Sequence, residues 1–296
     1  MVSGQSVWRA PPRHEPHPGM SPWRDRAGRL SPLKSVAFLL VLAPGLWLAV
    51  EWAVIGLGAR PFTTALRETG QWAIRLLFLS LAIAPFRRIF NWSDLIAVRR
   101  MIGVAALGYA IAHIGLYTLD QNLDVAKVLG EIWARFYLTI GAVAAVGLLA
   151  LGITSTDGMI RRLTGRRWQM LHRAAYGIAL LAVAHFFLQS RSNVWQPTLM
   201  AGLLIWLLSW RLWLRRAGMA GMGLRLGALG LGATLATALA EFGWYAGMTG
   251  IPALAVFAAN IDPAAGLRPA WAVAGAGLTV AAGAEILALA RTARTG

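Results

Sequence analysis

The feature of this sequence that most constrains its fold is a series of eight apolar stretches. Each is close to the roughly 20 residues that an α-helix needs to cross the hydrocarbon layer of a bilayer. They occupy residues 36–57, 70–86, 101–119, 132–153, 168–188, 198–214, 224–246 and 270–289. Because backbone groups in lipid must find their hydrogen bonds within the protein, the pattern predicts an all-α integral membrane protein, a helical bundle of about eight transmembrane helices.

Charge and hydropathy agree with a membrane location. The chain is 57% hydrophobic and 14% charged, which leaves too little polar surface for an ordinary soluble globule. A net charge of +16 in a soluble protein would suggest nucleic acid, but the arginines here form short clusters between apolar runs. Such clusters fix the orientation of membrane helices, and most of the basic residues fall on one side if both termini are cytoplasmic. We therefore expect the lipid bilayer as a partner and no nucleic acid.

Three histidines lie within or beside the apolar stretches, namely His113, His172 and His185. A neutral imidazole at membrane depth is costly unless its nitrogens are used, and a common use is to hold haem iron. His113 and His185 are expected at matched depth near the outer face, where they could share one haem. His172 would lie about 20 Å nearer the cytoplasm on the same helix as His185. A second haem level there is one interpretation; hydrogen bonding to a neighbouring helix remains the alternative for each histidine.

The chain has no cysteine, which excludes iron–sulfur ligation, covalent c-type haem and disulfides. The sequence therefore favours one or two non-covalent b-type haems. It also has no Gly-rich dinucleotide motif and no long cytosolic segment, so electrons would have to come from another component.

Arginines provide further candidate binding residues. Arg75 is expected near the outer end of the second span, where it could pair with a haem propionate or extend to the outer headgroups. The loop 154–167 ends in Arg166 and Arg167, followed by Trp168. These three could clamp a flavin phosphate and stack on a flavin or quinone ring, or the arginines could simply lie beside anionic lipid. The outer segment 120–131 is acidic and could dock a partner or be a solvated loop.

Three segments together resemble a known family. They are RETGQWAIRLLFLSLAIAPFRRI (67–89), VRRMIGVAALGYAIAHIGLY (98–117) and ITSTDGMIRRLTGRRWQMLHRAAYGIALLAVAHFF (153–187). Their order and spacing are similar to MsrQ (YedZ), the haem-binding membrane subunit of the periplasmic protein-methionine-sulfoxide reductase system. That family belongs to the ferric-reductase-like transmembrane group. The resemblance extends from about residue 31 to residue 216.

The resemblance implies a membrane b-type cytochrome of the bacterial inner membrane that also uses FMN. Electrons would come from the quinone pool or a cytosolic flavin reductase and pass to MsrP, a periplasmic molybdenum enzyme that reduces methionine sulfoxide in oxidised proteins. The family's haem histidines fall on His113, His172 and His185. The chain would thus be an electron-transfer subunit of an oxidoreductase complex rather than the catalytic subunit.

The resemblance also divides the chain. Residues 1–33, rich in Pro and Arg and containing His14 and His17, are expected to be a disordered cytoplasmic tail. Residues 34–216 would be the ferric-reductase-like haem-binding domain with six helices, and 217–296 a membrane extension with two helices that carries Glu241 and Glu285.

Two other functions remain open at this point. The haems could serve a ferric or cupric reductase or a superoxide-generating oxidase. Alternatively, the histidines, Arg75, Glu241 and Glu285 could form the proton path of a small transporter.

Overall fold

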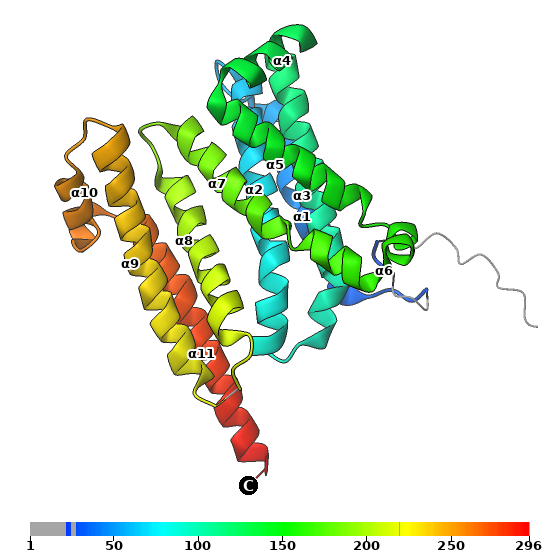
Figure 1. The fold of residues 1–296 in the computed structure, drawn as a ribbon, viewed down its shortest axis with the longest axis vertical. Coiled ribbons are helices and arrows are strands. Elements are labelled where there is room, and N and C mark those ends of the chain that lie inside the picture. Colours follow the sequence, from blue (N-terminus) through cyan, green and yellow to red (C-terminus); the bar gives the residue numbers. More distant parts are fainter. Residues whose placement is uncertain (1–21, 25–27, 219, 296) are drawn as a thin grey trace, which may run out of the picture.

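The computed structural model describes residues 22–24, 28–218 and 220–295, and most of the predicted tail, including His14 and His17, lies outside these ranges. The described chain is helical and contains no β-strand (Figure 1). Its helices are α1 (Pro32–Val50), α2 (Pro61–Ile89), α3 (Ile96–Asp120), α4 (Val125–Ala134), α5 (Phe136–Ile153), α6 (Asp157–His172), α7 (Ala175–Ser190), α8 (Trp195–Ser209), α9 (Met222–Met248), α10 (Ala253–Ala259) and α11 (Pro269–Thr295).

Seven helical segments of the described chain are long and apolar enough to cross a membrane. α2 is not one of the seven, but its 29 residues run the length of the bundle beside α3 (Figure 1). With α2 as the eighth, the structure confirms the predicted all-α bundle. We call the end of the bundle with α4 and α10 the α4 end, and the opposite end, with α6, the α6 end.

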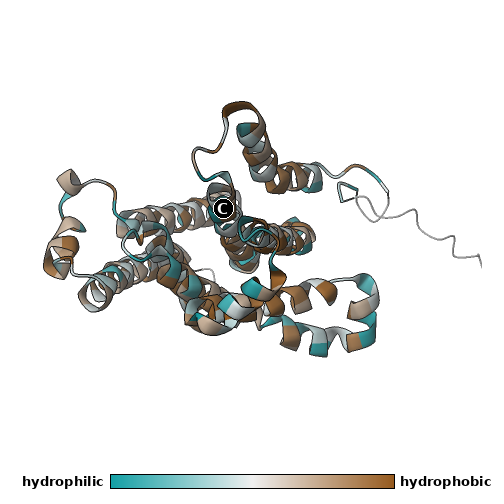
Figure 2. Ribbon diagram, turned by 90° about the horizontal axis from the view of Figure 1, so that it is seen from above, coloured by the Kyte–Doolittle hydropathy of each residue, from teal (hydrophilic) through white to brown (hydrophobic). Residues whose placement is uncertain are grey.

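The outer surface of the bundle is apolar, as lipid contact requires. Leu39, Val146 and Leu231 are each more than half exposed although they lie in the middle of long helices. Seen from above, hydrophobic residues are spread around the helices rather than gathered on one inner face (Figure 2). A helix that is apolar all round is typical of a membrane span.

Helices α2, α3, α5 and α7 form the central part of the bundle. α2 packs on α3 and α7, and α5 also packs on α3 and α7. α3 and α7 are not a closely packed pair in the described chain, so they face each other diagonally across the other two. The α6 half of this core is filled by buried apolar side chains such as Leu81, Ile102 and Ala179.

Tyr109 of α3 fastens α1 to this core. Pro44 lies inside α1 and has no N–H to donate. Beside it, the hydroxyl of Tyr109 accepts from the Gly45 N–H at 2.7 Å and donates to the Val41 carbonyl at 3.0 Å. The hydroxyl thus takes the place of one hydrogen bond of the helix.

Helices α8, α9 and α11 form a second packing unit. α9 and α11 cross closely at Gly230 and Gly277, where an added Cβ on Gly230 would lie 3.2 Å from the Gly277 Cα. Small residues allow this approach, as is common between membrane helices. At the α4 end, the buried Glu241 carboxylate accepts from Arg268 at 2.5 Å and from the Asn260 amide at 2.9 Å. This ion pair ties α9 to the segment between α10 and α11.

One predicted span begins later than expected. The stretch 132–153 was expected to be a single helix, but α4 ends at Ala134 and α5 begins at Phe136. Between them, Arg135 has an extended backbone (φ −113°, ψ 106°). Its guanidinium bonds the Glu131 carboxylate at 3.0 Å and the Tyr137 hydroxyl at 3.1 Å, which stabilises the corner.

Candidate functional site

His113 and His185 use their ring nitrogens in the same way. The Nδ1 of His113 lies 2.7 Å from the Leu66 carbonyl of α2, and the Nδ1 of His185 lies 2.7 Å from the Tyr137 carbonyl of α5. A carbonyl oxygen only accepts, so each Nδ1 carries a proton, and in the neutral form of the ring each Nε2 keeps its lone pair. Within the described residues, neither Nε2 has a hydrogen-bond partner.

The two rings lie at the same end of the central helices. His113 is near the end of α3 and His185 near the end of α7, whereas Leu66 and Tyr137 are near the starts of α2 and α5. All four positions are therefore toward the α4 end. The structure brings His113 and His185 to one depth on facing helices, as the sequence predicted.

These two residues fit a haem better than a metal ion held by protein alone. No group of three or more His, Cys, Asp or Glu side chains that could hold a metal ion occurs in the described chain. A haem iron needs only two axial ligands from the protein, because the porphyrin supplies the others. Two neutral imidazoles with free Nε2 atoms, each oriented through Nδ1 by a carbonyl, have the chemistry of such ligands.

Glycines lie under both rings. A Cβ on Gly70 of α2 would lie 2.7 Å from the His113 Nδ1, and a Cβ on Gly141 of α5 would lie 2.7 Å from the His185 Nδ1. The sequence analysis missed both glycines and both carbonyls. The sequence did contain a sign of these contacts, because the two histidines lie in similar tetrapeptides, Ile-Ala-His-Ile at 111–114 and Val-Ala-His-Phe at 183–186. In each case a helix earlier in the chain carries a glycine in its first half, Gly70 in α2 and Gly141 in α5.

His172 lies at the opposite, α6 end. Its ring stacks on Trp168 with a centroid distance of 3.9 Å, and its Nε2 is 3.3 Å from the Thr154 hydroxyl. The Trp168 indole N–H donates to the Thr154 carbonyl at 2.8 Å. His172 is therefore separated from His113 and His185, at a second level.

His172 and His185 lie on one helical membrane segment, residues 157–190, but this segment is interrupted between them. α6 ends at His172, and α7 begins at Ala175. The N–H groups of Ala174 and Tyr176 bond carbonyls three residues back, at 3.0 and 3.2 Å, which is the tighter 3₁₀ pattern. The angle between the His172 and His185 side chains around the helix axis therefore does not follow from the regular α-helical repeat.

Arg75 is placed differently from the prediction. It lies at the middle of α2 rather than near its outer end. Its guanidinium donates to Gln71 at 2.7 Å and to Gln196 at 3.4 Å, and it lies 5.0 Å from the centre of the Trp72 ring. Because helical side chains point toward the helix N-terminus, the charge lies about one turn closer to the α4 end, near the level of Gly70. Both of its hydrogen-bond partners are neutral.

The predicted cation cluster of the inner loop is not brought together with an aromatic ring. Arg166 and Arg167 are exposed, and Trp168 packs on His172. A different cluster forms nearby, which the sequence did not predict. Arg211 lies 4.4 Å above the Tyr176 ring and 3.3 Å from its hydroxyl, and it is within electrostatic range of Arg99 together with Arg87. In the described chain these three arginines have no carboxylate partner.

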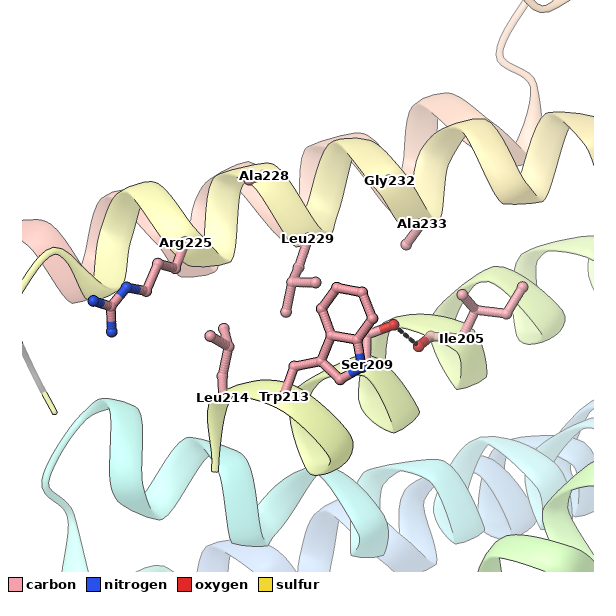
Figure 3. A pocket seen from close by; sticks show the side chains of 9 residues that line it. All are labelled: Ile205, Ser209, Trp213, Leu214, Arg225, Ala228, Leu229, Gly232 and Ala233. Carbon is pink, nitrogen blue, oxygen red and sulfur yellow. Dashed lines mark hydrogen bonds between the residues drawn. The ribbon is translucent and has the colours of Figure 1, made fainter. Parts of the chain in front are cut away.

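A groove of about 490 Å³ lies between α8 and α9 (Figure 3). Its walls are mainly apolar, with Leu214, Leu229 and Ala233 among them, and Arg225 lies at one end. The Ser209 hydroxyl is already used by the Ile205 carbonyl at 2.8 Å. The groove therefore suits a hydrocarbon chain, and it holds none of the three histidines.

In the described chain, neither Glu241 nor Glu285 contacts one of the three histidines. Glu241 is paired with Arg268 in the second packing unit, and the Glu285 carboxylate lies against Gly223 of α9 near the α6 end. They do not form a continuous path with Arg75 and the histidines.

Comparison with known proteins places residues 69–183 in the family described as ferric reductase like transmembrane component. The chain is 40% identical over 185 residues to the protein-methionine-sulfoxide reductase heme-binding subunit MsrQ of Azospira oryzae, covering 62% of this chain and 79% of the relative. It is 37% identical to the MsrQ of Rhodospirillum rubrum, covering 64% and 89%. For the MsrQ of Bordetella parapertussis the identity is 39%, covering 65% and 94%. No solved structure matches the chain.

Proposed function

This chain belongs to the MsrQ family of haem-binding subunits, and on that premise we propose that it is a b-type cytochrome that delivers electrons to a periplasmic methionine sulfoxide reductase, MsrP. The α4 end would face the periplasm, and both termini the cytoplasm. Support comes from the arginines at the α6 end, among them Arg87, Arg88, Arg99 and Arg100, since basic residues mark the cytoplasmic side of the inner membrane.

The observation that carries the proposal is the matched pair of imidazoles at the α4 end. Haem b, when bound, supplies a one-electron carrier in a region of low dielectric constant. The Nε2 atoms of His113 and His185 would hold its iron. The carbonyls of Leu66 and Tyr137 would keep the protons on Nδ1 and make each Nε2 a stronger donor to iron. Helices α2 and α5, which pack between the two histidine helices, would exclude water.

Arg75 would hold a propionate of this haem. Its charge lies near the level of Gly70, and both of its hydrogen-bond partners are neutral, although the Glu68 carboxylate is within electrostatic range. A carboxylate in this position would form the charge-assisted hydrogen bonds that guanidinium groups favour.

The α6 end would receive electrons from the quinone pool or a reduced flavin. His172 would serve a second haem or an FMN there. The cluster of Arg87, Arg99 and Arg211 is better placed for the anionic group of such a cofactor than Arg166 and Arg167, because Arg99 and Arg211 are half-buried whereas Arg166 and Arg167 are exposed. Trp168, stacked on His172, would form a wall of that site.

We also propose a functional division of the chain. Residues 34–216 would bind haem, with the tail 1–33 in the cytoplasm and 217–296 as a membrane extension. The family match at 69–183 falls within the first of these segments.

Haem content of single variants tests the proposal. We expect His113→Ala and His185→Ala to lose the same haem, measured by absorbance and by the spectra of the remaining centre. His172→Ala should affect a different centre or none. Equal partial loss in all three would contradict two separate levels.

The electron acceptor needs its own test. The purified, reduced protein should be oxidised rapidly by purified MsrP with methionine sulfoxide, and slowly by ferric citrate or oxygen. Faster oxidation by ferric citrate would favour a metal reductase, and faster oxidation by oxygen with release of superoxide would favour an oxidase. A protein purified without a Soret band would favour a transporter.

A further inference from the structure

Each of the two imidazoles rests on a neighbouring helix through the same pair of backbone features. His113 contacts the Leu66 carbonyl and Gly70, and His185 contacts the Tyr137 carbonyl and Gly141. In both cases the glycine follows the carbonyl by four residues. We call each pair, a carbonyl with the glycine four positions later, an imidazole seat.

The spacing of four has a physical reason. In an α-helix the carbonyl of one residue accepts from the N–H four residues later, and the side chain of that later residue points back over the carbonyl. A ring from another helix can reach the carbonyl only if this side chain is small. The imidazole Nδ1–H can therefore share the carbonyl at 2.7 Å because the fourth residue is glycine.

The ring itself occupies the space of the missing side chain. The three heavy atoms nearest to a Cβ on Gly70 all belong to the His113 ring, with Cε1 at 2.9 Å. At Gly141 all three belong to the His185 ring, with Cε1 at 2.8 Å and Cγ at 3.1 Å. Neither glycine is needed for close approach of two backbones, so ordinary helix packing does not account for them.

From these contacts we infer that Gly70 and Gly141 are positioning residues for the haem ligands. They act through His113 and His185 by fixing the rotation of each ring and the proton on its Nδ1, so that both Nε2 atoms are directed away from the seats. The inference rests on the proposed function and deepens it. The backbone seats, rather than polar side chains, would determine the ligand geometry.

Alanine substitutions provide the test. In Gly70→Ala and Gly141→Ala the new Cβ displaces the ring and breaks its bond to the carbonyl. Loss of an outer partner of a metal ligand weakens binding about 10- to 100-fold, so we expect haem retention in detergent to fall by at least tenfold. Haem that remains should show altered low-spin EPR g values and a shifted midpoint potential, because ring orientation and imidazole basicity have changed.

Gly115→Ala is the matched control. Gly115 lies on α3 two residues after His113, so it points to nearly the opposite side of that helix. It has open space around it. This variant should keep the haem content, EPR spectrum and midpoint potential of the parent protein.

A double substitution separates the seat from a general folding defect. In a His113→Ala background the ring that would collide is gone, so adding Gly70→Ala should leave the thermal unfolding temperature unchanged. In a His185→Ala background, where His113 remains, Gly70→Ala should still lower it. An equal effect of Gly70→Ala in both backgrounds would overturn the inference.

The inference and the proposed function fail in different ways. Absence of haem from the parent protein would refute the proposed function. A haem-loaded parent whose Gly70→Ala and Gly141→Ala variants keep the same haem retention, EPR spectrum and potential would refute only the seats.

Discussion

Glycine makes close contact possible in both the central helices and the extension, but the contacting group differs. At Gly70 and Gly141 it is an imidazole ring. At Gly277 it is the backbone of the partner helix, because an added Cβ would lie 2.9 Å from the Gly230 Cα. A missing side chain thus makes room for an imidazole ring in one region and brings two helices together in the other.

The polar groups of the two regions differ in the same way. The central helices hold two half-buried imidazoles whose Nε2 atoms have no partner in the described chain, whereas the extension holds an ion pair in which the buried Glu241 carboxylate is bonded by Arg268. The imidazoles can therefore bind a further group, whereas the Glu241–Arg268 pair already uses its charges within the protein. We therefore expect substitutions in the extension to change stability without changing haem, and those at the seats to change haem first.

Removing one partner of the buried ion pair should have the largest effect on stability. In Arg268→Ala the Glu241 carboxylate stays buried without its cation, and breaking a buried pair in this way costs about 3–5 kcal/mol. Denaturant unfolding in detergent would measure the loss, and haem content per folded protein should not change. If haem is lost in proportion, the two regions are not independent.

A smaller effect is expected where α9 and α11 cross. Gly277→Ala forces the backbones apart, and overpacking of this kind costs about 1–3 kcal/mol. Gly275→Ala on the same helix has open space and should be neutral or slightly stabilising. If the two regions differ as described, Gly277→Ala should keep the haem spectrum of the parent protein, whereas Gly70→Ala should change it. Unfolding curves of the two variants recorded side by side would show the difference.

The smallest effect should come from Tyr109→Phe in the core. The change leaves the Gly45 N–H and the Val41 carbonyl without the hydroxyl between them, which costs about 1 kcal/mol. Haem content should stay the same, because Tyr109 contacts α1 and not the histidines. A loss of haem as large as in Gly70→Ala would show that the sensitivity of the core is not confined to the seats.

The sequence predicted the helices well because lipid imposes a simple rule on apolar stretches. It did not predict the corners at Arg135 and at Arg173–Ala174, because neither contains the proline or glycine that usually marks a helix end. Instead, the extended backbone of Arg135 and the 3₁₀ bonds before α7 interrupt the helices. The helix propensities of single residues say little about where such interruptions of a helix occur.

The candidate site was predicted in part. His113 and His185 were visible as polar residues in apolar surroundings, and their common depth followed from the topology. Their hydrogen-bond acceptors were not visible, because Leu66 and Tyr137 contribute main-chain oxygens that every residue has. The cluster around Tyr176 was also missed, since Arg87, Arg99 and Arg211 come from distant parts of the chain.

The hydroxyl of Tyr109 also bears on how the protein is made. Its partner Gly45 lies 64 residues earlier, so α1 leaves the ribosome before the group that completes its hydrogen bonding exists. A proline-containing helix in the bilayer depends on neighbouring helices to satisfy its freed backbone groups. Helix α1 is therefore finished only when α3 arrives, which links its maturation to the order of biosynthesis.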